Sequence, residues 1–393
     1  MMIPSLMIRG RELPLISPIQ KRDYQIRVID RSVELYEEGW ETIIIESPTG
    51  SGKTIMGLGV CKYLRRKYGY NVGWMTMRRT NLAQAKAAND AIFGIDGVSW
   101  ISMFDRHPPR VDILVSDEVQ HDAAESSSHV HAACGARRVL GLSATPFRTD
   151  RLKLAFQKCV KDAGIHRLIQ DGWLSKYWHY SIDDFTVESV ARTYLEDREE
   201  WGKTAVYWHR IEDCVAFSRK LAENGVRAEV VDGSTRNVEG LLAEFGDGGF
   251  PVLTSVAKLT EGFDCPTLTT VFVRDASKLP TIQMSGRVLR IADGKPHSNI
   301  VQSRRARWQF PKTALPEKAF VQRNDHWLCL GQSSIIADAS HRNARMLATS
   351  PVSKVPDFLR GKPSRTGGTP FHERLWEPVA GTRHMPGRDG HGE

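Results

Sequence analysis

The chain has 393 residues, 41% of them hydrophobic and 25% charged, which predicts about two to three folded domains. Its aliphatic runs are no longer than a strand, and Arg9 and Arg11 interrupt any signal-peptide core, so we expect no membrane contact and a cytosolic location. The net charge of +8 permits a polyanionic partner, and six cysteines without Cys-x-x-Cys spacing argue against a disulfide framework or a zinc ribbon.

Short apolar strands alternate with helical patterns in the first part of the chain. Strands are expected at residues 42–46, 71–76, 98–102, 111–116 and 137–142. Such alternation predicts a parallel sheet covered by helices on both faces.

A loop of small residues follows the first of these strands. Residues 47–54 read Ser-Pro-Thr-Gly-Ser-Gly-Lys-Thr, and such a loop turns successive backbone N–H groups toward one anion at the start of a helix. Lys53 supplies a cation for phosphates, and Thr54 supplies a ligand for Mg²⁺. The alternative is a glycine-rich turn without a ligand, which the preceding strand and the Gly-Lys-Thr sequence disfavour. We therefore expect a nucleoside triphosphate to contact Thr49, Gly50, Ser51, Gly52, Lys53 and Thr54.

Two adjacent carboxylates follow the strand expected at residues 111–116. Asp117 would hold Mg²⁺, through water, and Glu118 would polarise the attacking water as general base. An acidic loop on a solvated edge is the alternative. It is disfavoured because the pair directly follows a hydrophobic strand downstream of the phosphate loop.

The second part of the chain repeats the alternation. Strands are expected at residues 204–208, 227–231, 251–255, 269–273 and 298–302, with helices at Glu212–Asn224 and Leu279–Arg290. The joint between the two parts is expected at Gly172–Leu174 and around Tyr180–Asp184. From about Ser350 onward, Pro, Gly, Arg and His accumulate without an apolar period, which predicts disorder.

Six segments carry a resemblance to a known family. They are Arg22-Asp23-Tyr24-Gln25, the phosphate loop, Asp117-Glu118-Val119-Gln120-His121, Ser143-Ala144-Thr145-Pro146, Thr260-Glu261-Gly262-Phe263-Asp264 and Gln283-Met284-Ser285-Gly286-Arg287-Val288-Leu289-Arg290. In this order they resemble superfamily-two helicases and translocases of the DEAD/DEAH-related type, including compact phage and bacterial members. The resemblance extends from residue 22 to about residue 302.

The resemblance implies an α/β fold with two tandem RecA-like domains, each a mainly parallel sheet with helices on both faces. It places the first domain at residues 21–170 and the second at 171–310. Residues 1–20 would be an N-terminal extension, residues 311–350 a C-terminal extension, and residues 351–393 a disordered tail.

The family also implies roles for residues around the nucleotide. Gln25 would read the adenine edge and Arg22 would stack on the base, which favours ATP. Gly262 and Asp264 would approach the ribose or phosphates from the second domain.

Three residues of the last segment have implied roles in hydrolysis. Arg287 and Arg290, three apart on one helix face, would be arginine fingers that neutralise charge on the transferred phosphoryl group. A solvated basic helix face is the alternative for the two arginines. Gln283 would orient the water or contact His121.

The remaining implied roles concern the nucleic acid. Ser143 and Thr145 would couple the state of ATP to the grip on a strand. Candidate phosphate contacts are Arg79, Ser102 and Ser255, although Arg79 could equally be a surface residue at a helix start and the serines could be caps. Residues 304–308, Arg-Arg-Ala-Arg-Trp, fit a strand-binding surface and a packed basic loop equally well.

The sequence therefore predicts an ATP hydrolase of the helicase or translocase type, with ATP and Mg²⁺ at an interdomain cleft and with DNA as the favoured track. One alternative is an RNA helicase. Another, of a different class, is a nucleotide-gated clamp that binds strands or a protein partner with little turnover.

Overall fold

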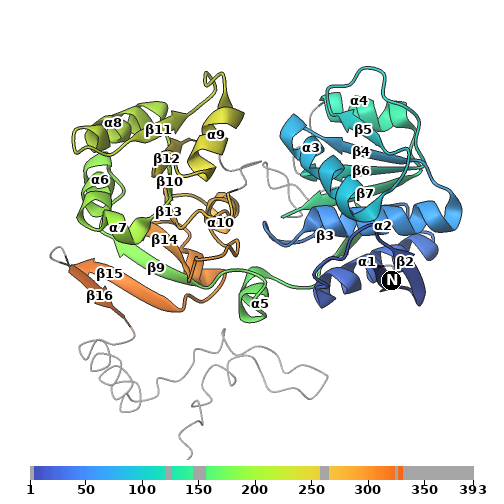
Figure 1. Cartoon of the computed structure of the whole chain (residues 1–393), viewed down its shortest axis with the longest axis horizontal. Coiled ribbons are helices and arrows are strands. Elements are labelled where there is room, and N and C mark those ends of the chain that lie inside the picture. The colour runs from blue at the N-terminus through green and yellow to red at the C-terminus, as the bar shows by residue number, and fades with distance from the viewer. Residues whose placement is uncertain (1–3, 120–124, 145–155, 257–264, 324–325, 331–393) are drawn as a thin grey trace, which may run out of the picture. The chain divides into compact units, whose positions relative to one another are not determined.

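Two sheets of mainly parallel strands organise the chain, one of six strands and one of eight (Figure 1). This computed structural model describes residues 4–119, 125–144, 156–256, 265–323 and 326–330. The predicted fold class, α/β with two mainly parallel sheets, is confirmed. The tail predicted at residues 351–393 lies outside the described residues.

The first sheet has the strand order β5-β4-β6-β7-β3-β8, and all its pairings are parallel. Its strands are β3 (Thr42–Glu46), β4 (Val72–Thr76), β5 (Ser99–Ser102), β6 (Ile113–Asp117), β7 (Arg138–Ser143) and β8 (Lys158–Val160). The five strands predicted for this part match β3 to β7 within two residues at each end. Strand β8 was not predicted.

Helices flank this sheet and a hairpin precedes it. The helices are α1 (Asp23–Glu37), α2 (Lys53–Tyr68), α3 (Arg79–Ala88), the π-helical turn η1 (Asn89–Phe93) and α4 (Glu125–Cys134). The next helix, α5 (Ile165–Gln170), instead buries Ile165 and Leu168 in a core cluster of the second sheet. Strands β1 (Ser5–Ile8) and β2 (Arg11–Pro14) form the hairpin, whose Leu6, Ile8 and Leu13 are buried in the same core cluster as α1. The segment expected as an N-terminal extension is therefore part of the first core.

Helix α2 lies very close to the sheet. A Cβ atom at Gly57 would come within 2.9 Å of the Trp74 ring, and a Cβ atom at Gly59 within 2.6 Å of Ile29. Glycine inside a helix costs about 1 kcal/mol relative to alanine, but a side chain at either position would push α2 away from β4 or α1. This packing fixes the start of α2, where the phosphate loop ends.

The register of the first sheet brings the chemically important strand ends to one edge. Strand β7 lies between β3 and β6, with Ser143 opposite Glu46 and Leu142 opposite Asp117. Because the strands are parallel, the loops that follow β3, β6 and β7 leave from the same edge. Ligands of open α/β sheets bind at this carboxyl edge.

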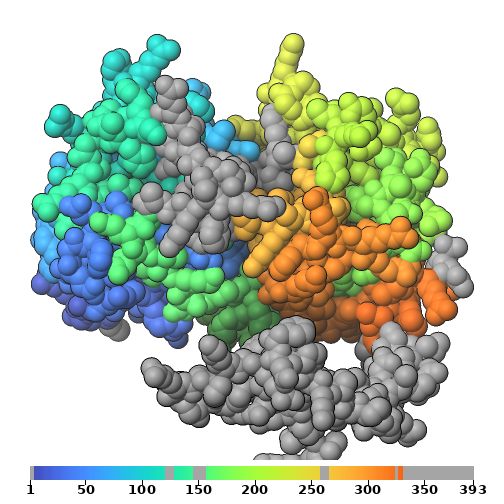
Figure 2. Space-filling view, turned by 180° about the vertical axis from the view of Figure 1, so that it is seen from behind, coloured from blue at the N-terminus to red at the C-terminus, as the bar shows by residue number. Residues whose placement is uncertain are grey.

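The second sheet has the order β11-β12-β10-β13-β14-β9-β15-β16, and only the pair β15 and β16 is antiparallel. Its strands are β9 (Tyr177–Ile182), β10 (Thr204–Tyr207), β11 (Ala228–Val231), β12 (Val252–Ser255), β13 (Thr270–Val273), β14 (Ser298–Ser303), β15 (Lys318–Arg323) and β16 (His326–Cys329). The last strands, coloured orange, reach the surface on the side seen in Figure 2.

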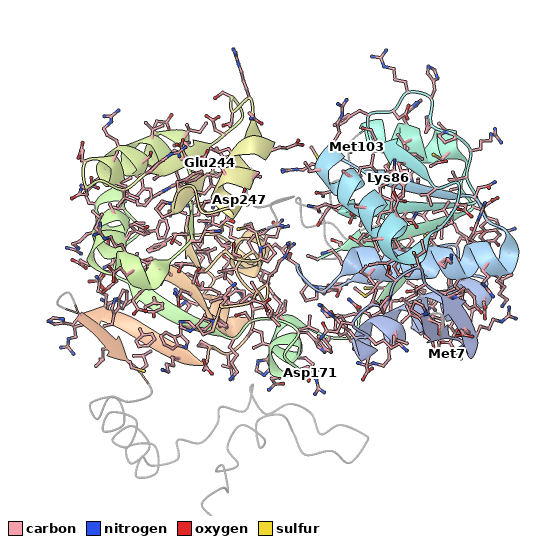
Figure 3. The ribbon with its side chains drawn as sticks, viewed as in Figure 1. Met7, Lys86, Met103, Asp171, Glu244 and Asp247 are labelled. Carbon is pink, nitrogen blue, oxygen red and sulfur yellow. The ribbon has the colours of Figure 1, made fainter. Side chains whose placement is uncertain are left out.

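The second sheet buries both of its faces. Along β10, Ala205 and Tyr207 belong to one core cluster and Val206 belongs to another, as the two-residue period of a strand requires. Figure 3 shows the side chains that fill these layers. The helices of this part are α6 (Val187–Glu196), α7 (Arg198–Trp201), α8 (Ile211–Ala222), α9 (Val238–Gly246), α10 (Lys278–Gly286) and the 3₁₀ turn η4 (Phe310–Lys312).

Two expectations for this part were wrong. Residues around Tyr180 do not form a joint, because Tyr177–Ile182 is strand β9 inside the sheet, between β14 and β15. The predicted helix Leu279–Arg290 ends early, at Gly286, and residues 287–289 form a turn. Arg287 and Arg290 therefore leave from a turn and do not share a helix face.

Candidate nucleotide-binding site

The phosphate loop connects β3 to α2 in a conformation that depends on glycine. Gly50 and Gly52 both have φ of 81°, in the left-handed region. A Cβ atom at Gly52 would also lie 2.4 Å from the amide nitrogen of Gln25. Inside the loop, the hydroxyl of Ser47 donates to that of Ser51 over 2.7 Å. Ser47, the first residue of the loop, thus closes it with a side-chain hydrogen bond.

Helix α1 supports this loop from outside. The phenol of Tyr24 and the amide of Gln25 both donate to the carbonyl oxygen of Ser51, over 2.6 and 2.8 Å. Both side chains are buried. Arg22, expected to stack on a base, lies over the ring of Trp173, 5.1 Å from its centroid. Tyr24 and Trp173 are functional candidates that the sequence analysis missed.

Lys53 is the buried cation of the loop. Its side chain is 9% exposed and its ammonium group donates to the carbonyl oxygen of Ser47 over 3.3 Å. A cation held against the loop in this way lies next to backbone N–H groups that can bind phosphate. Thr54 follows it in the first turn of α2 and contributes to the same cavity.

Asp117 and Glu118 are at the end of β6, as predicted. Burial and the neighbouring Glu118 carboxylate raise the pKa of Asp117 to about 7, while nearby Lys53 opposes this rise. Glu118 has φ of 58°, a conformation that residues other than glycine rarely adopt. Such strain, worth about 1–3 kcal/mol, is concentrated at functional sites.

Arg287 and Arg290 come from the turn after α10. Arg287 is 8% exposed. Burial lowers the pKa of Arg290 to about 10, so this guanidinium group stays charged at neutral pH.

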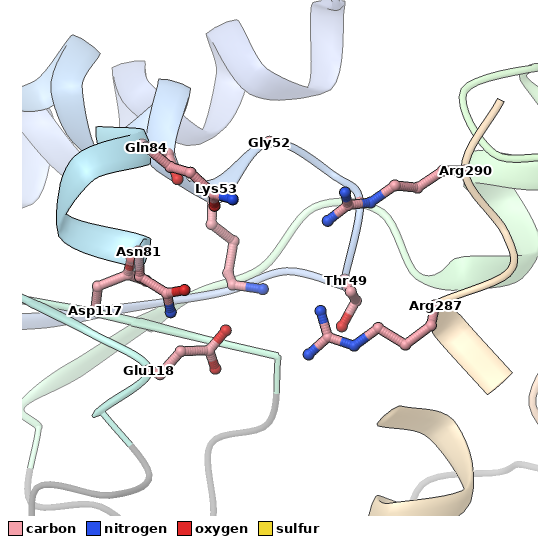
Figure 4. A pocket seen from close by; sticks show the side chains of 11 residues that line it. Thr49, Gly52, Lys53, Asn81, Gln84, Asp117, Glu118, Arg287 and Arg290 are labelled. Carbon is pink, nitrogen blue, oxygen red and sulfur yellow. The ribbon is translucent and has the colours of Figure 1, made fainter. Parts of the chain in front are cut away.

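These groups line one cavity of about 280 Å³. Figure 4 shows Lys53, Arg287 and Arg290 pointing into it, with the Glu118 carboxylate facing the same space. The volume of about 280 Å³ lies just below the roughly 300–1,000 Å³ typical of sites for drug-sized ligands, so the cavity can take a small anionic group such as a phosphate. Its lining residues are Thr49, Gly50, Gly52, Lys53, Thr54, Asn81, Gln84, Asp117, Glu118, Arg287 and Arg290.

The lining includes two residues that the sequence analysis did not select. Asn81 and Gln84 lie one turn apart on α3, and both face the cavity (Figure 4). Their spacing of three residues was the available signal. Gln283, on α10, is not among the lining residues.

Several predicted residues do not line the cavity or cannot be placed. Ser143 ends β7, and its carbonyl oxygen accepts a hydrogen bond from the Ser47 N–H over 3.0 Å, which joins this segment to the phosphate loop. The other coupling and second-domain candidates lie outside the described residues; they are His121, Thr145, Gly262 and Asp264.

The cavity also fits the oxygen ligands that Mg²⁺ requires. Thr54 and Asp117 bring a hydroxyl and a carboxylate to one cavity. No cluster of three or more His, Cys, Asp or Glu suited to a metal occurs in the part of the chain that the structure describes. A site with only one or two protein ligands is usual for Mg²⁺, because this ion keeps several water ligands and also binds the phosphates of the substrate.

Two candidate contacts to a nucleic-acid strand, Arg79 and Ser102, lie in the first sheet's part of the chain, at the ends of β4 and β5. Arg79 is exposed and begins α3, and the Ser102 hydroxyl accepts a hydrogen bond from the Phe104 N–H over 3.3 Å. Two large apolar side chains lie beside them and were missed, Met77 at 45% and Phe104 at 61% exposure. The Met103 N–H donates to the Thr76 carbonyl oxygen, which joins the two loops.

Ser255, the candidate of the second sheet, is fully buried. Its hydroxyl donates to the carbonyl oxygen of Val231 over 2.7 Å. A contact between this hydroxyl and a nucleic-acid strand would require that hydrogen bond to break. The structure therefore favours a structural role for the side chain, which joins β12 to β11.

The basic segment at residues 304–308 is partly neutralised. Arg304 pairs with Asp183, and Arg307 pairs with Asp275 over 2.8 Å. The Trp308 ring lies under the ammonium groups of Lys278 and Lys312, 5.2 and 5.5 Å from its centroid. These contacts favour the packed basic loop over an open stacking surface.

Two family profiles match the chain. Residues 18–94 match "Type III restriction enzyme, res subunit", and residues 186–292 match "Helicase conserved C-terminal domain". The first range contains the phosphate loop, and the second contains α10 with Arg287 and Arg290. No helix among the described residues is both long and apolar enough to cross a membrane, and the cytosolic location stays a prediction.

Two curated proteins are similar over most of the chain. A Schizosaccharomyces pombe protein that carries the name of a mitochondrial ATP-dependent helicase, irc3, is 24% identical over 70% of this chain and 56% of its own length. A "51.5 kDa protein" of a Lactococcus phage is 25% identical over 63% of this chain and 62% of its own length. The chain thus spans less than two thirds of these relatives.

Two solved structures share the fold. The type ISP restriction-modification enzyme LlaBIII bound to DNA aligns with a TM-score of 0.53 and 15% identity, over 75% of this chain and 28% of that one. Mss116p bound to single-stranded RNA and AMP-PNP aligns with a TM-score of 0.53 and 14% identity, over 77% and 78%. At these identities the likeness concerns the fold alone.

Proposed function

This chain belongs to superfamily two of the helicases, an ATP-dependent family, and on that premise we propose that it hydrolyses ATP to move along or remodel DNA. The observation that carries the proposal is the cavity in which Lys53, Glu118, Arg287 and Arg290 meet. It combines a phosphate-binding loop, a carboxylate suited to general base catalysis and two buried or partly buried guanidinium groups.

The residues divide the hydrolysis of the γ-phosphate between them. Lys53 and the loop N–H groups bind the phosphates, while Glu118 accepts a proton from the attacking water. Arg287 and Arg290 offset the negative charge that develops on the transferred phosphoryl group. Thr54 and Asp117 would hold Mg²⁺, which would neutralise part of the charge of the phosphates.

The origin of the lining residues supports a motor cycle. Lys53 and Glu118 follow strands of the first sheet, whereas Arg287 and Arg290 follow α10 of the second. A nucleotide held by both groups favours the state in which they are close, and release of phosphate removes that preference. If both parts contact one strand, the cycle moves the protein along it.

DNA is the proposed track on the strength of the first family profile and the segment Arg22 to Gln25. The solved structures with this fold include one bound to DNA and one bound to RNA. The fold therefore does not choose between them, and RNA remains the alternative within the same class.

ATP turnover measured with different nucleic acids tests the proposal. The rate should be low for the protein alone and rise several-fold with single-stranded or forked DNA. Added salt should remove this stimulation, because phosphate contacts release counterions. Stimulation by RNA and not by DNA would favour the RNA alternative. A rate that no nucleic acid changes at low salt would refute the motor and favour a clamp.

A further inference from the structure

The turn that carries the two arginines is held by hydrogen bonds from outside it. Three consecutive carbonyl oxygens accept them. The Val288 oxygen accepts from the ammonium group of Lys295 and, over 2.7 Å, from the Ser298 hydroxyl. The Leu289 oxygen accepts from the Ser175 N–H over 2.8 Å, and the Arg290 oxygen accepts from Lys295 over 2.9 Å.

The position of these residues explains why their carbonyls need partners. Helix α10 ends at Gly286, so residues 288–290 lie beyond it, and Val288 and Leu289 are fully buried. A buried main-chain carbonyl requires a hydrogen-bond partner. Lys295 donates two of these bonds from a segment further along the chain. A turn closed by the Lys295 N–H on the Ala292 oxygen, with Gly294 at φ of 76°, returns it to the carbonyls.

Lys295 is also kept partly out of water at this place. Burial lowers its pKa to about 7; the nearby Arg290 charge lowers the pKa further, and Cys265 opposes the shift. A lysine on an open surface would keep its full hydration. The neutral amine still carries N–H donors, so the bonds to the turn are available in both protonation states.

We propose that Lys295 is a positioning residue, which fixes the main chain of the Arg287–Arg290 turn so that both guanidinium groups reach the nucleotide phosphates. Lys295 is not among the residues that line the cavity. It therefore acts through the arginines. The inference rests on the proposed function, which gives those arginines their role.

The expected size follows from the arginines themselves. Arg287→Ala and Arg290→Ala should each lower kcat on the order of 10³-fold, the effect of losing an arginine finger. Lys295→Met keeps both guanidinium groups but loosens their support. Misplacement by about 1 Å costs up to roughly 100-fold, so we expect a loss of kcat of about 10- to 100-fold with KM for ATP within about twofold.

Lys203 offers a matched control in the same part of the chain. Its ammonium group donates to the Gly246 carbonyl oxygen, at the end of α9, over 2.5 Å and to the Thr267 hydroxyl over 2.9 Å. Lys203→Met therefore removes the same kind of bond from a helix end remote from the arginines. Its kcat should stay within about twofold of wild type.

Two further measurements separate positioning from general damage. Lys295→Met should weaken binding of ADP with aluminium fluoride, a mimic of the transferring phosphoryl group, more than binding of ADP alone. In the Arg290→Ala background it should lower kcat less than in wild type, because one of the two groups it positions is gone. Ser298→Ala, a smaller change at the same carbonyl, should show the same pattern to a lesser extent and serves if Lys295→Met does not fold.

The proposal is overturned if Lys295→Met, or Ser298→Ala in its place, lowers kcat no more than Lys203→Met does. Equal loss of kcat in the wild-type and Arg290→Ala backgrounds also overturns it. Failure of the proposed function would appear in the wild type, as absence of ATP turnover with every nucleic acid. Lys295 is then judged by the binding of ADP with aluminium fluoride against ADP alone.

Discussion

The side-chain amide of Gln25 donates a hydrogen bond to the carbonyl oxygen of Ser51 over 2.8 Å and so fastens helix α1 to the phosphate loop. Tyr24 donates to the same oxygen. Gln25 therefore supports the loop in addition to any contact with a base. Its second amide hydrogen and its carbonyl oxygen are the groups that could read adenine.

Replacement of Gln25 separates the two roles. If Gln25 reads adenine, Gln25→Ala should weaken ATP binding about tenfold or more and GTP binding much less, because the lost hydrogen bonds are specific to the base. Affinities for both nucleotides can be measured with fluorescent analogues. Tyr24→Phe, which removes the bond to Ser51 and the bond that the hydroxyl accepts from Arg22, is the control and should weaken both nucleotides equally, because neither bond is specific to the base. If Gln25→Ala weakens the binding of ATP and GTP equally, Gln25 only supports the phosphate loop and does not read adenine.

Lys53 and Glu118 should give opposite patterns of binding and turnover. Lys53→Ala removes the buried cation at the phosphates, so ATP affinity and turnover should both fall. Glu118→Gln keeps the shape of the side chain but loses the proton acceptor, so ATP should still bind while hydrolysis falls by about 10²- to 10⁴-fold. Equilibrium binding and single-turnover hydrolysis distinguish the two. Equal losses of nucleotide affinity would contradict the division of roles.

The first sheet and the phosphate loop were predictable because local signals agree with one another there. Residues 42–46 form a continuous apolar run, and the Gly-Ser-Gly-Lys-Thr sequence after it needs glycine where the structure has φ of 81° at Gly50 and Gly52. The carboxylates at the end of β6 follow an equally clear strand. In each case the residues that specify the structure are neighbours in sequence.

The missed features depend on contacts between distant residues. Strand β9 reads Tyr-Trp-His-Tyr-Ser-Ile and pairs with β14 more than a hundred residues later, so its place in the sheet has no local signal. The turn at Arg287 likewise depends on hydrogen bonds from Lys295, Ser298 and Ser175, which the sequence pattern does not reveal. The prediction therefore continued the helix to Arg290, although it ends at Gly286. The support of the phosphate loop by Tyr24 spans 27 residues.

Phe104 is expected to contribute to the binding of single strands. Its ring is 61% exposed in the loop after β5, which a hydrogen bond joins to the end of β4, just before Met77 and the exposed Arg79. A base stacked on an aromatic ring is worth about 1–3 kcal/mol, so Phe104→Ala should weaken single-stranded DNA binding on the order of tenfold. The slope of affinity against salt should stay unchanged, because no phosphate contact is lost.

Two variants serve as comparisons for Phe104. Arg79→Ala should weaken binding and reduce the salt slope by about one, as loss of a phosphate contact does. Leu315→Ala, at an apolar side chain that is 68% exposed after η4, should change neither quantity. Binding measured by fluorescence anisotropy at several salt concentrations gives both. Unchanged affinity in Phe104→Ala would show that the ring does not meet the strand.

Lys295 should make stability depend on pH. Its pKa is lowered to about 7 in the folded protein, against about 10.4 in an unfolded chain. Below pH 7 both states bind the proton and Lys295 adds no pH dependence. Between pH 7 and about 10 the unfolded chain binds more protons, so the free energy of unfolding should rise with pH, by at most about 1.4 kcal/mol per unit.

The variant Lys295→Met has no group that titrates at this position. The unfolding free energies of wild type and of this variant can be measured with urea at pH 6, 7, 8 and 9. Their difference should grow in favour of wild type above pH 7, because the contributions of all other titratable groups are the same in both proteins and cancel. A constant difference across this range would mean that Lys295 keeps an ordinary pKa and is well hydrated beside the arginine turn.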